Sequence, residues 1–527
     1  MSHDPTSTTR FFSKKFSMLG AALSLLTPAI FAGCGNDNTP PDNTAPPVEI
    51  TVGAMLPRTG PNANSDWVSA VELAVTHMNA AIKKAKMPRP VSFKLDEIDT
   101  ASNEAMANVA MQTYSDEHAK IVISEASNAA IGANKWNYTQ ANIDGTLQIP
   151  VISFTATSAS LNKSNTTDMD ATRQLALQDP SEWFFRTCPE SNALSNLRLA
   201  QVFKALSPTN VANGDVNGDG KVKVVWIGSS DTSTQASITG DRKAFDTYVA
   251  GLPAGSLPYV PETVLFDPGA DPTTFNYGPA IAMATDSHPN DGAIPVSAPI
   301  LTTDDGAPDL IINKALPTIA IPFIKAYKQN TANTTAIFQD GSFRRNTLLA
   351  ALGNAADGQK GVSNIAAEHT KGGDTFKAAQ QAVTGWAPAA YEAQAYDAAA
   401  LSLLAIIKAS ITAGDPATIT PTGTRDALKD LNHVGEAGVV TFYTGTDEFA
   451  KAITEMLKDV PGVLDYSGAS GNNNFSSPNP TANDPGGNVL DRAVLWRIAG
   501  GQFVEDAIFD CVSNSMCSPT GEKPLIE

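Results

Sequence analysis

The chain has 527 residues, of which 42% are hydrophobic and 17% are charged. This apolar content is enough for sizeable cores, and a prior of about 150 residues per domain predicts two to four domains. The 36 Lys and Arg residues against 54 Asp and Glu residues give a net charge of −18. Because this acidity would repel phosphates and no basic run is interleaved with aromatic residues, a nucleic-acid partner is not expected.

The N-terminus has the features of an export signal. Arg10, Lys14 and Lys15 precede the apolar stretch 19–32, LGAALSLLTPAIFA, which is too short to span a bilayer. The motif FAGC, ending at Cys34, resembles a bacterial lipobox, in which the cysteine is acylated. The alternative is that Cys34 is an ordinary thiol beside a signal-peptidase site. We expect a lipoprotein signal peptide over 1–33, lipidation of Cys34, and a location outside the cytoplasm on a membrane.

Residues 34–48 are rich in Pro, Asn, Asp and Thr and predict a disordered tether. Cys511 and Cys517 lie six positions apart, and in the oxidising compartment that export implies they are expected to form a disulfide. The six histidines are scattered without the spacing of metal ligands, so neither a metal nor another cofactor is expected.

Beyond the tether, short apolar runs alternate with helical patterns, which is typical of βαβ units and mostly parallel sheets. The first series predicts strands at 50–56, 91–99, 120–124 and 149–154, and helices at 66–82 and 103–117. The second predicts a helix at 192–206, strands at 221–228, 263–267, 309–315 and 335–340, and helices at 239–249 and 318–329. A long Ala-rich helix follows at 391–413, and a low-complexity insert at 467–488. The pattern predicts two α/β lobes.

Seven segments occur in an order that resembles the leucine/isoleucine/valine-binding branch of ABC-transporter substrate-binding proteins. They include ITVGAMLPRTGPNANSDW, IPVISFTATSASL, WFFRTCPESNALSN, YEAQAYDAAA, GEAGVVTF and LWRIAGGQFV. The resemblance implies the type I periplasmic-binding fold, with two doubly wound Rossmann-like lobes joined by three hinge crossovers. The crossovers are expected near 186–190, 340–344 and 431–440. The N-terminal lobe then contains 49–187 and 343–432, the C-terminal lobe contains 188–342 and 433–510, and 511–527 is a tail.

Ligands of open α/β sheets bind beyond the carboxyl ends of the strands, which here precede hydroxyl-rich loops. We expect Ser127, Thr155 and Thr157 to hold a carboxylate, with Ser233 in the corresponding loop of the other lobe. The resemblance implies that an acidic residue of that lobe takes an ammonium group, and Asp340 stands at the matching position. Helix capping by the hydroxyls and a solvated turn at Asp340 are the structural alternatives.

Two further features have competing interpretations. Relatives often place a tyrosine where residues 232–234 lack an aromatic side chain, so the ligand is expected to differ from a branched-chain amino acid. Trp67 either faces the cleft or belongs to the core. The segment 213–222, NGDVNGDGKV, contains the start of a calcium loop at Asp215, but Trp226 stands where such a loop needs an acidic residue, which favours a surface turn.

The expected function is that of a lipid-anchored solute-binding protein. It would capture a small polar solute, an amino acid or a related amide or carboxylate, for an ABC-transporter permease. No nucleophile elbow, P-loop, dinucleotide fingerprint or zinc-protease motif is present, so we do not expect an enzyme. The alternatives are a sensory or scaffold lipoprotein of the same fold without a transport role and an unrecognised extracytoplasmic hydrolase.

Overall fold

The structure is a computed structural model. It describes residues 46–60, 62–161, 171–179, 182–189, 197–199, 214–252, 254–269, 271–286, 292–293, 306–364, 370–431, 433, 438–471, 473, 492–513 and 516–519. The expected signal peptide, Cys34, most of the expected tether and most of the insert at 467–488 lie outside these residues.

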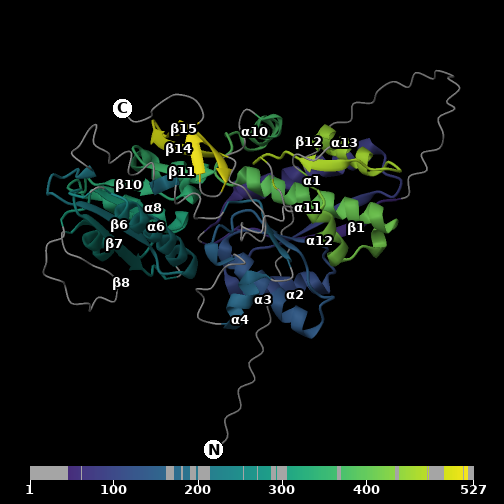
Figure 1. Ribbon diagram of the computed structural model, residues 1–527, viewed down its shortest axis with the longest axis horizontal. Helices are drawn as coiled ribbons and strands as arrows, with labels where there is room; N and C mark the ends of the chain where they lie inside the picture. The colour runs from purple at the N-terminus through teal and green to yellow at the C-terminus, as the bar shows by residue number, and fades with distance from the viewer. Residues whose placement is uncertain are drawn as a thin grey trace, which may run out of the picture. The chain divides into compact units, whose positions relative to one another are not determined.

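The first sheet has five parallel strands in the order β2-β1-β3-β4-β5. They are β1 (Val48–Met55), β2 (Val91–Ile98), β3 (Val122–Ser124), β4 (Val151–Ser153) and β5 (Phe184–Arg186). Helices cover both faces, as parallel sheets require. One face packs against α1 (Ser65–Ala85), α11 (Glu392–Ala413) and α13 (Thr446–Met456), and the other against α2 (Glu104–Asp116) and α3 (Ser127–Ile143) (Figure 1).

Three other helices and a small sheet complete this part of the chain. The helices are α4 (Ala171–Gln178), α10 (Lys371–Thr384) and α12 (Pro421–Lys429). A parallel pair, β12 (Val439–Phe442) and β13 (Val463–Tyr466), contributes apolar side chains to the same core as α1 and α11. We call the first sheet with its helices, α10 to α13 and the β12–β13 pair the first lobe.

Helix α11 is buried along almost its whole length of 22 residues. By length and composition it is apolar enough to cross a membrane, but it packs on α1 inside the first lobe. Its Asp397 carboxylate accepts hydrogen bonds from the Tyr466 hydroxyl at 2.7 Å and from the Ala469 and Ser470 backbone N–H groups at 2.8 Å. A Cβ at Gly468 would lie 2.6 Å from the carboxylate oxygens, so glycine permits this close approach. Asp397 thus anchors the segment that follows β13 to the helix.

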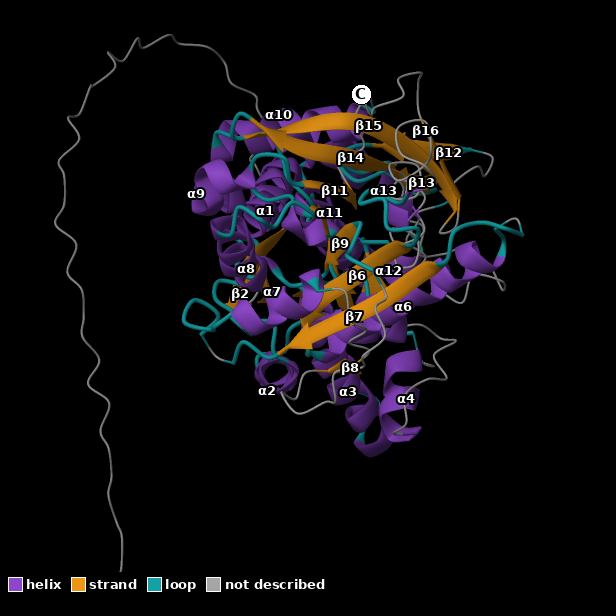
Figure 2. Cartoon of the chain, turned by 90° about the vertical axis from the view of Figure 1, so that its left-hand side faces the viewer, coloured by secondary structure: helices purple, strands orange, loops and turns teal. Residues whose placement is uncertain are grey.

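The second sheet has nine strands in the order β16-β15-β14-β11-β10-β9-β6-β7-β8. The strands are β6 (Val222–Ser229), β7 (Tyr259–Phe266), β8 (Gly292–Ala293), β9 (Leu310–Asn313), β10 (Ala336–Gln339), β11 (Lys360–Asn364), β14 (Arg492–Ala499), β15 (Gln502–Ser513) and β16 (Met516–Pro519). Strands β6 to β11 are parallel, and β14 to β16 are antiparallel and continue the same sheet (Figure 2).

Helices also cover both faces of the second sheet. Helices α7 (Gly278–Thr285), α8 (Pro317–Gln329) and α9 (Asn346–Leu352) share a core with one face. Helix α6 (Thr232–Ala250) and the short described stretch 197–199 pack on the other. We call the second sheet with these helices the second lobe.

The lobe boundaries differ from the expected ones in three places. Strand β11 pairs with β10 and β14, so 343–364 lies with the second lobe and not the first. Residues 438–466 pack in the core of the first lobe, although 433–510 is expected in the second. Strands β15 and β16 extend the second sheet into the expected tail. The first crossover follows β5 as expected, but the next two fall between 364 and 371 and between 466 and 492.

Candidate functional site

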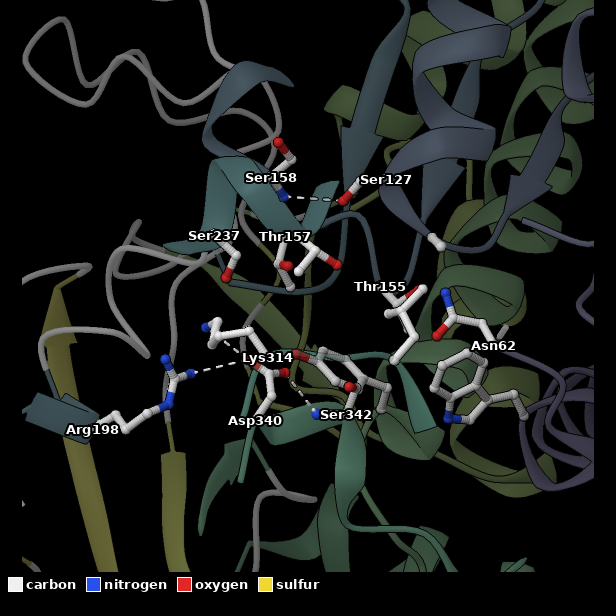
Figure 3. Close-up of a pocket in the computed structure, with 15 residues that line it drawn as sticks. Asn62, Ser127, Thr155, Thr157, Ser158, Arg198, Ser237, Lys314, Asp340 and Ser342 are labelled. Atoms are coloured by element: carbon white, nitrogen blue, oxygen red, sulfur yellow. Dashed lines mark hydrogen bonds and ion pairs between the residues drawn. The ribbon is translucent and has the colours of Figure 1, made fainter. Parts of the chain in front are cut away.

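A cavity is lined by residues of both lobes at the carboxyl ends of their strands (Figure 3). The lining residues of the first lobe include the loops after β3 and β4, and those of the second include the residues after β9 and β10. Open α/β sheets bind ligands at this edge. The cavity is lined by Asn62, Trp67, Ala126, Ser127, Thr155, Thr157, Ser158, Arg198, Thr234, Ser237, Lys314, Leu316, Asp340, Ser342 and Tyr391.

Hydroxyl groups form the wall of the first lobe. Ser127 is the first residue of α3, and its Oγ accepts a hydrogen bond from the Ser158 backbone N–H at 3.2 Å. The N-cap residue of α3 is Ala126, which supplies no side-chain cap. Thr155 is only 9% exposed, and its Oγ1 has no hydrogen-bond partner among the described residues. An uncapped helix N-terminus and a buried unpaired hydroxyl both favour a bound acceptor such as a carboxylate.

The loop that carries Thr155 and Thr157 is held from behind. Arg186, at the end of the neighbouring strand β5, is fully buried and donates to the backbone carbonyls of Ala156 and Ser158, each at 3.3 Å. The loop is therefore fixed by the protein itself, which reduces the entropy that a ligand must remove on binding.

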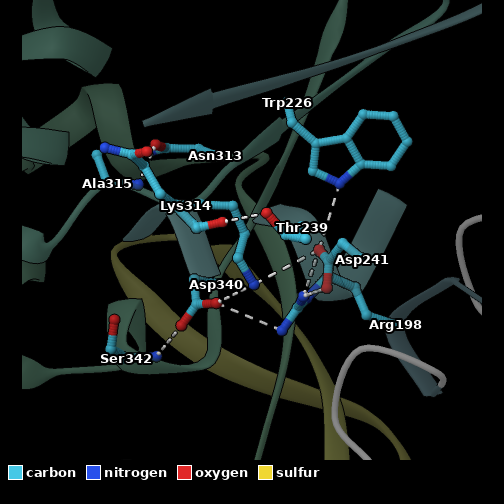
Figure 4. Close-up of polar contacts among 10 residues, drawn as sticks. Arg198, Trp226, Thr239, Asp241, Asn313, Lys314, Ala315, Asp340 and Ser342 are labelled. Carbon is cyan, nitrogen blue, oxygen red and sulfur yellow. Dashed lines mark hydrogen bonds and ion pairs between the residues drawn. The ribbon is translucent and has the colours of Figure 1, made fainter. Parts of the chain in front are cut away.

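Strand register brings Lys314 and Asp340 together in the wall of the second lobe. In the parallel pair β9 and β10, Asn313 lies opposite Gln339, so the next residue of each strand is Lys314 and Asp340. Lys314 Nζ lies 2.8 Å from Asp340 Oδ2, while Asp340 Oδ1 accepts the Ser342 backbone N–H at 3.1 Å (Figure 4). Both oxygens of Asp340 thus have partners within the protein.

Two further residues complete a buried group of four charges, which we call the charge cluster: Arg198, Asp241, Lys314 and Asp340. Arg198 Nη1 donates to both oxygens of Asp241 at 3.0 and 2.8 Å, and its Nη2 lies 3.4 Å from Asp340 Oδ2. Trp226 Nε1 also donates to Asp241, at 3.3 Å. Burial raises the pKa of Asp340, but the charges of Lys314 and Arg198 outweigh this effect and hold the pKa well below its ordinary value.

Arg345 joins the two lobes beside the cavity. Its guanidinium donates to the Asn62 backbone carbonyl at 3.1 Å and to Asn62 Oδ1 at 3.2 Å, and it lies 4.2 Å from the centre of the Trp67 ring. Burial lowers the pKa of Arg345 to about 9, which leaves it charged at neutral pH. Asn62 and Trp67 line the cavity, so they contact both this cation and the space for a ligand.

Tyr391 lines the cavity with a strained backbone. Its φ of 67° lies in the left-handed region, which a tyrosine adopts only at a cost, and it directly precedes α11. The preceding residue, Ala390, donates to the Arg344 carbonyl at 3.0 Å and accepts from Trp67 Nε1 at 2.9 Å. These contacts hold the Tyr391 segment where the two lobes meet.

Four of the five expected ligand-binding residues line this one cavity: Ser127, Thr155, Thr157 and Asp340. Ser233 lies in the first turn of α6, and its side chain is outside the described part of the structure, while Thr234 and Ser237 of the same helix line the cavity. The alternative for Asp340 is a solvated turn residue; Asp340 does cap the short helical turn Gly341–Phe343, but Lys314 and Arg198 hold its carboxylate. Trp67 is both a core residue and a cavity residue.

Sequence analysis missed Lys314, Arg198 and Tyr391. The lysine directly after the apolar run DLIIN was a usable signal, because it stands at the same strand end as Asp340. The positions of Arg198 and Tyr391 depend on tertiary packing and had no local signal.

The calcium-like loop has its carboxylate engaged by backbone groups. Asp215 accepts hydrogen bonds from the Gly218 and Gly220 backbone N–H groups, at 2.6 and 2.7 Å. Within the described ranges no group of three His, Cys, Asp or Glu side chains is arranged to hold a metal ion. This arrangement fits a turn before β6, the interpretation that the sequence favours.

Comparison with known proteins gives a fold. No protein-family profile matches the chain, and no curated protein matches its sequence at a significant level. The leucine-binding protein LivK from Thermotoga maritima is 16% identical with a TM-score of 0.55, over 87% of this chain and 98% of that one. LivJ from Streptococcus pneumoniae, a branched-chain amino acid transporter substrate-binding protein in complex with isoleucine, is 15% identical with a TM-score of 0.54, over 88% of this chain and 99% of that one.

A solute-binding protein of an ABC transporter from R. palustris, in complex with benzoate, is 17% identical. Its TM-score is 0.56, over 91% of this chain and 99% of that one. The similarity in each case extends over nearly the whole of the solved chain, so both lobes are matched. The chain therefore has the type I periplasmic-binding fold of these solute-binding proteins, as the order of its sequence motifs predicts.

Proposed function

We propose that the chain is an extracytoplasmic solute-binding protein that captures a small polar solute between its two lobes and delivers it to an ABC importer. The observation that carries the proposal is the buried Thr155 hydroxyl, which has no partner in the described part of the chain and lines the same cavity as Arg198, Lys314 and Asp340 of the other lobe. A cavity shared by two lobes suits capture by closure around a ligand. Structural neighbours that are named as solute-binding proteins of ABC transporters support it.

The proposed solute is an amino acid or a related amide or carboxylate, whose carboxylate binds the first lobe. Ser127, Thr155 and Thr157 supply hydroxyls there, and α3 supplies backbone N–H groups at its N-terminus. Neutral donors hold an anion without adding a second charge that must be desolvated. In this role the solute is bound and released chemically unchanged.

The proposed hinge consists of the three chain crossovers, and the two lobes move about it as rigid bodies. Arg345 and Ala390 contribute contacts between the lobes next to the cavity. Closure would bring the hydroxyls of the first lobe and the charge cluster of the second around one solute.

A ligand screen tests the binding function. The full-length protein, extracted in detergent, is heated with amino acids, amides, small carboxylates, aromatic acids, sugars and a polyamine. A solute at about 100 times its dissociation constant should stabilise the folded state by about 2.7 kcal/mol, which appears as a higher melting temperature. If no compound of any class raises the melting temperature, the proposed function is wrong.

Fractionation tests the proposed lipid anchor at Cys34. The Cys34→Ser variant should leave the membrane fraction and remain folded, because acylation needs the thiol. The control is Cys188→Ser, which changes a buried thiol of the body and should leave the protein on the membrane. Equal amounts of wild type and Cys34→Ser on the membrane would contradict the anchor.

A further inference from the structure

The charge cluster sets the charge of the cavity wall opposite the hydroxyls. Its two cations and two carboxylates are nearly all withdrawn from solvent: the side chains of Arg198, Lys314 and Asp241 are 2%, 1% and 0% exposed. Asp340 is 21% exposed and lines the cavity. Asp241 is not among the lining residues, so the charged groups of the described lining that face a solute are two cations and one carboxylate.

Asp340 is consequently a poor partner for a ligand ammonium. Its Oδ2 already lies 2.8 Å from Lys314 Nζ and 3.4 Å from Arg198 Nη2, and its Oδ1 accepts a hydrogen bond from the Ser342 backbone N–H. A third cation at this carboxylate would meet two like charges in a site with little water, where such repulsion costs several kcal/mol. Moving either cation away from Asp340 would also disturb its interaction with Asp241. Arg198 donates to both oxygens of Asp241, and Lys314 Nζ lies 3.5 Å from Asp241 Oδ2.

The other walls suit an anion with an apolar body. The hydroxyls and the uncapped N-terminus of α3 donate from the first lobe. Trp67 and Tyr391 add aromatic surface, and Leu316 adds an aliphatic side chain. Apart from Asp340, the described lining contains no ionised acceptor for an ammonium group.

We infer that the solute is an organic carboxylate that carries no ammonium group beside its carboxylate. The inference rests on the proposed function and narrows its solute class. Asp340 then acts as a positioning residue, which fixes Lys314 and Arg198 at the cavity wall.

Matched pairs of compounds test the inference. Calorimetry on the full-length protein compares 4-methylpentanoate with leucine, and 3-phenylpropanoate with phenylalanine; the members of each pair differ only in the ammonium group. We expect at least one acid to bind and its amino-acid partner to bind about 100-fold more weakly or not at all. An amino acid that binds as tightly as its acid overturns the inference but leaves the binding function intact. If no organic acid binds while an amino acid, an amide, a sugar or the polyamine of the screen does, the inference alone is wrong; if nothing binds, the function fails with it.

A variant separates the cluster's role from general damage. Lys314→Gln removes one of the two cations that occupy Asp340, so the preference for the acid over its amino acid should fall by about tenfold or more. Lys325→Gln, on the exposed face of α8, is the matched control and should retain the wild-type preference. An unchanged preference in a folded Lys314→Gln protein overturns the inference. If that variant does not fold, Lys314→Arg, which keeps the charge, should retain the preference, and a loss of it counts against the inference.

Discussion

Substitution of Asp241 is the sharpest test of the charge cluster, because this carboxylate neutralises part of the cluster's positive charge but does not line the cavity. Asp241→Asn keeps the size and one acceptor oxygen but removes the negative charge. Asp241 accepts two hydrogen bonds from Arg198 and one from Trp226, and it lies 3.5 Å from Lys314. The substitution leaves two buried cations with Asp340 as their remaining carboxylate within the cluster.

The expected loss of unfolding free energy follows from this imbalance. Breaking a buried ion pair by removing one partner costs about 3 to 5 kcal/mol. Because Asp340 still neutralises part of the charge and asparagine keeps an acceptor, we expect the lower end of this range. The same uncompensated positive charge should strengthen the binding of an organic acid, so stability and affinity should change in opposite directions.

Urea unfolding at neutral pH measures the stability change, and calorimetry with the acid identified in the paired comparison measures the affinity change. Asp246→Asn, an exposed carboxylate on the same helix, is the control and should change stability by less than about 0.5 kcal/mol. An Asp241→Asn protein as stable as that control would refute the description of the cluster as a balanced buried set.

Three other predictions concern single features. Thr155→Val should weaken solute binding by about 1 to 3 kcal/mol in calorimetry without lowering the melting temperature of the free protein, because its Oγ1 has no partner among the residues that the structure describes; a lower melting temperature with unchanged affinity would contradict this. Cys511 and Cys517 are cross-strand partners in β15 and β16, so the exported protein should carry a disulfide, and mass spectrometry should find neither thiol alkylated without prior reduction. Burial raises the pKa of Glu392 from 4.5 to about 7, so its contribution to stability is full below pH 4.5 and is lost as the pH rises to about 7. Glu392→Gln should therefore match the wild type at pH 4 and exceed it at pH 8 by up to about 3 kcal/mol in urea unfolding; equal stability at both pH values would argue against the raised pKa.

Much of the site could be predicted because apolar runs mark where strands end. Thr155 follows IPVISF directly, Thr157 follows two residues later, and Asp340 follows AIFQ, so their places at the carboxyl edge come from local pattern alone. Their meeting in one cavity needed the motif order, which predicts that two such sheets face each other. The same motif order predicts the fold, which the comparison with solved structures confirms.

The occupancy of Asp340 could not be predicted in this way. It depends on the parallel register between β9 and β10, which no residue of either strand encodes by itself. The same limit applies to β11, whose short sequence KGVSN gives no indication of which sheet it joins. Because strand pairing of this kind cannot be read from the segments themselves, two crossovers lie away from their expected positions and the charge cluster is not predicted.

Asp397 in α11 affects the export of the chain across the membrane as well as its folded state. On the proposed export route, a 22-residue segment apolar enough to lodge in a bilayer must pass through the membrane without stopping. In the folded protein the Asp397 carboxylate is satisfied by the segment after β13, but that segment is made later and has no structure during passage. An unpaired aspartate within a spanning helix opposes insertion, by about 2.5 to 3.5 kcal/mol at the helix centre and by less towards the ends. Asp397 is the sixth of the 22 residues of α11, and Glu392 adds a second charge at the helix start. The Asp397 carboxylate thus disfavours retention of α11 in the membrane during export, and in the folded protein it anchors the segment after β13 to the helix.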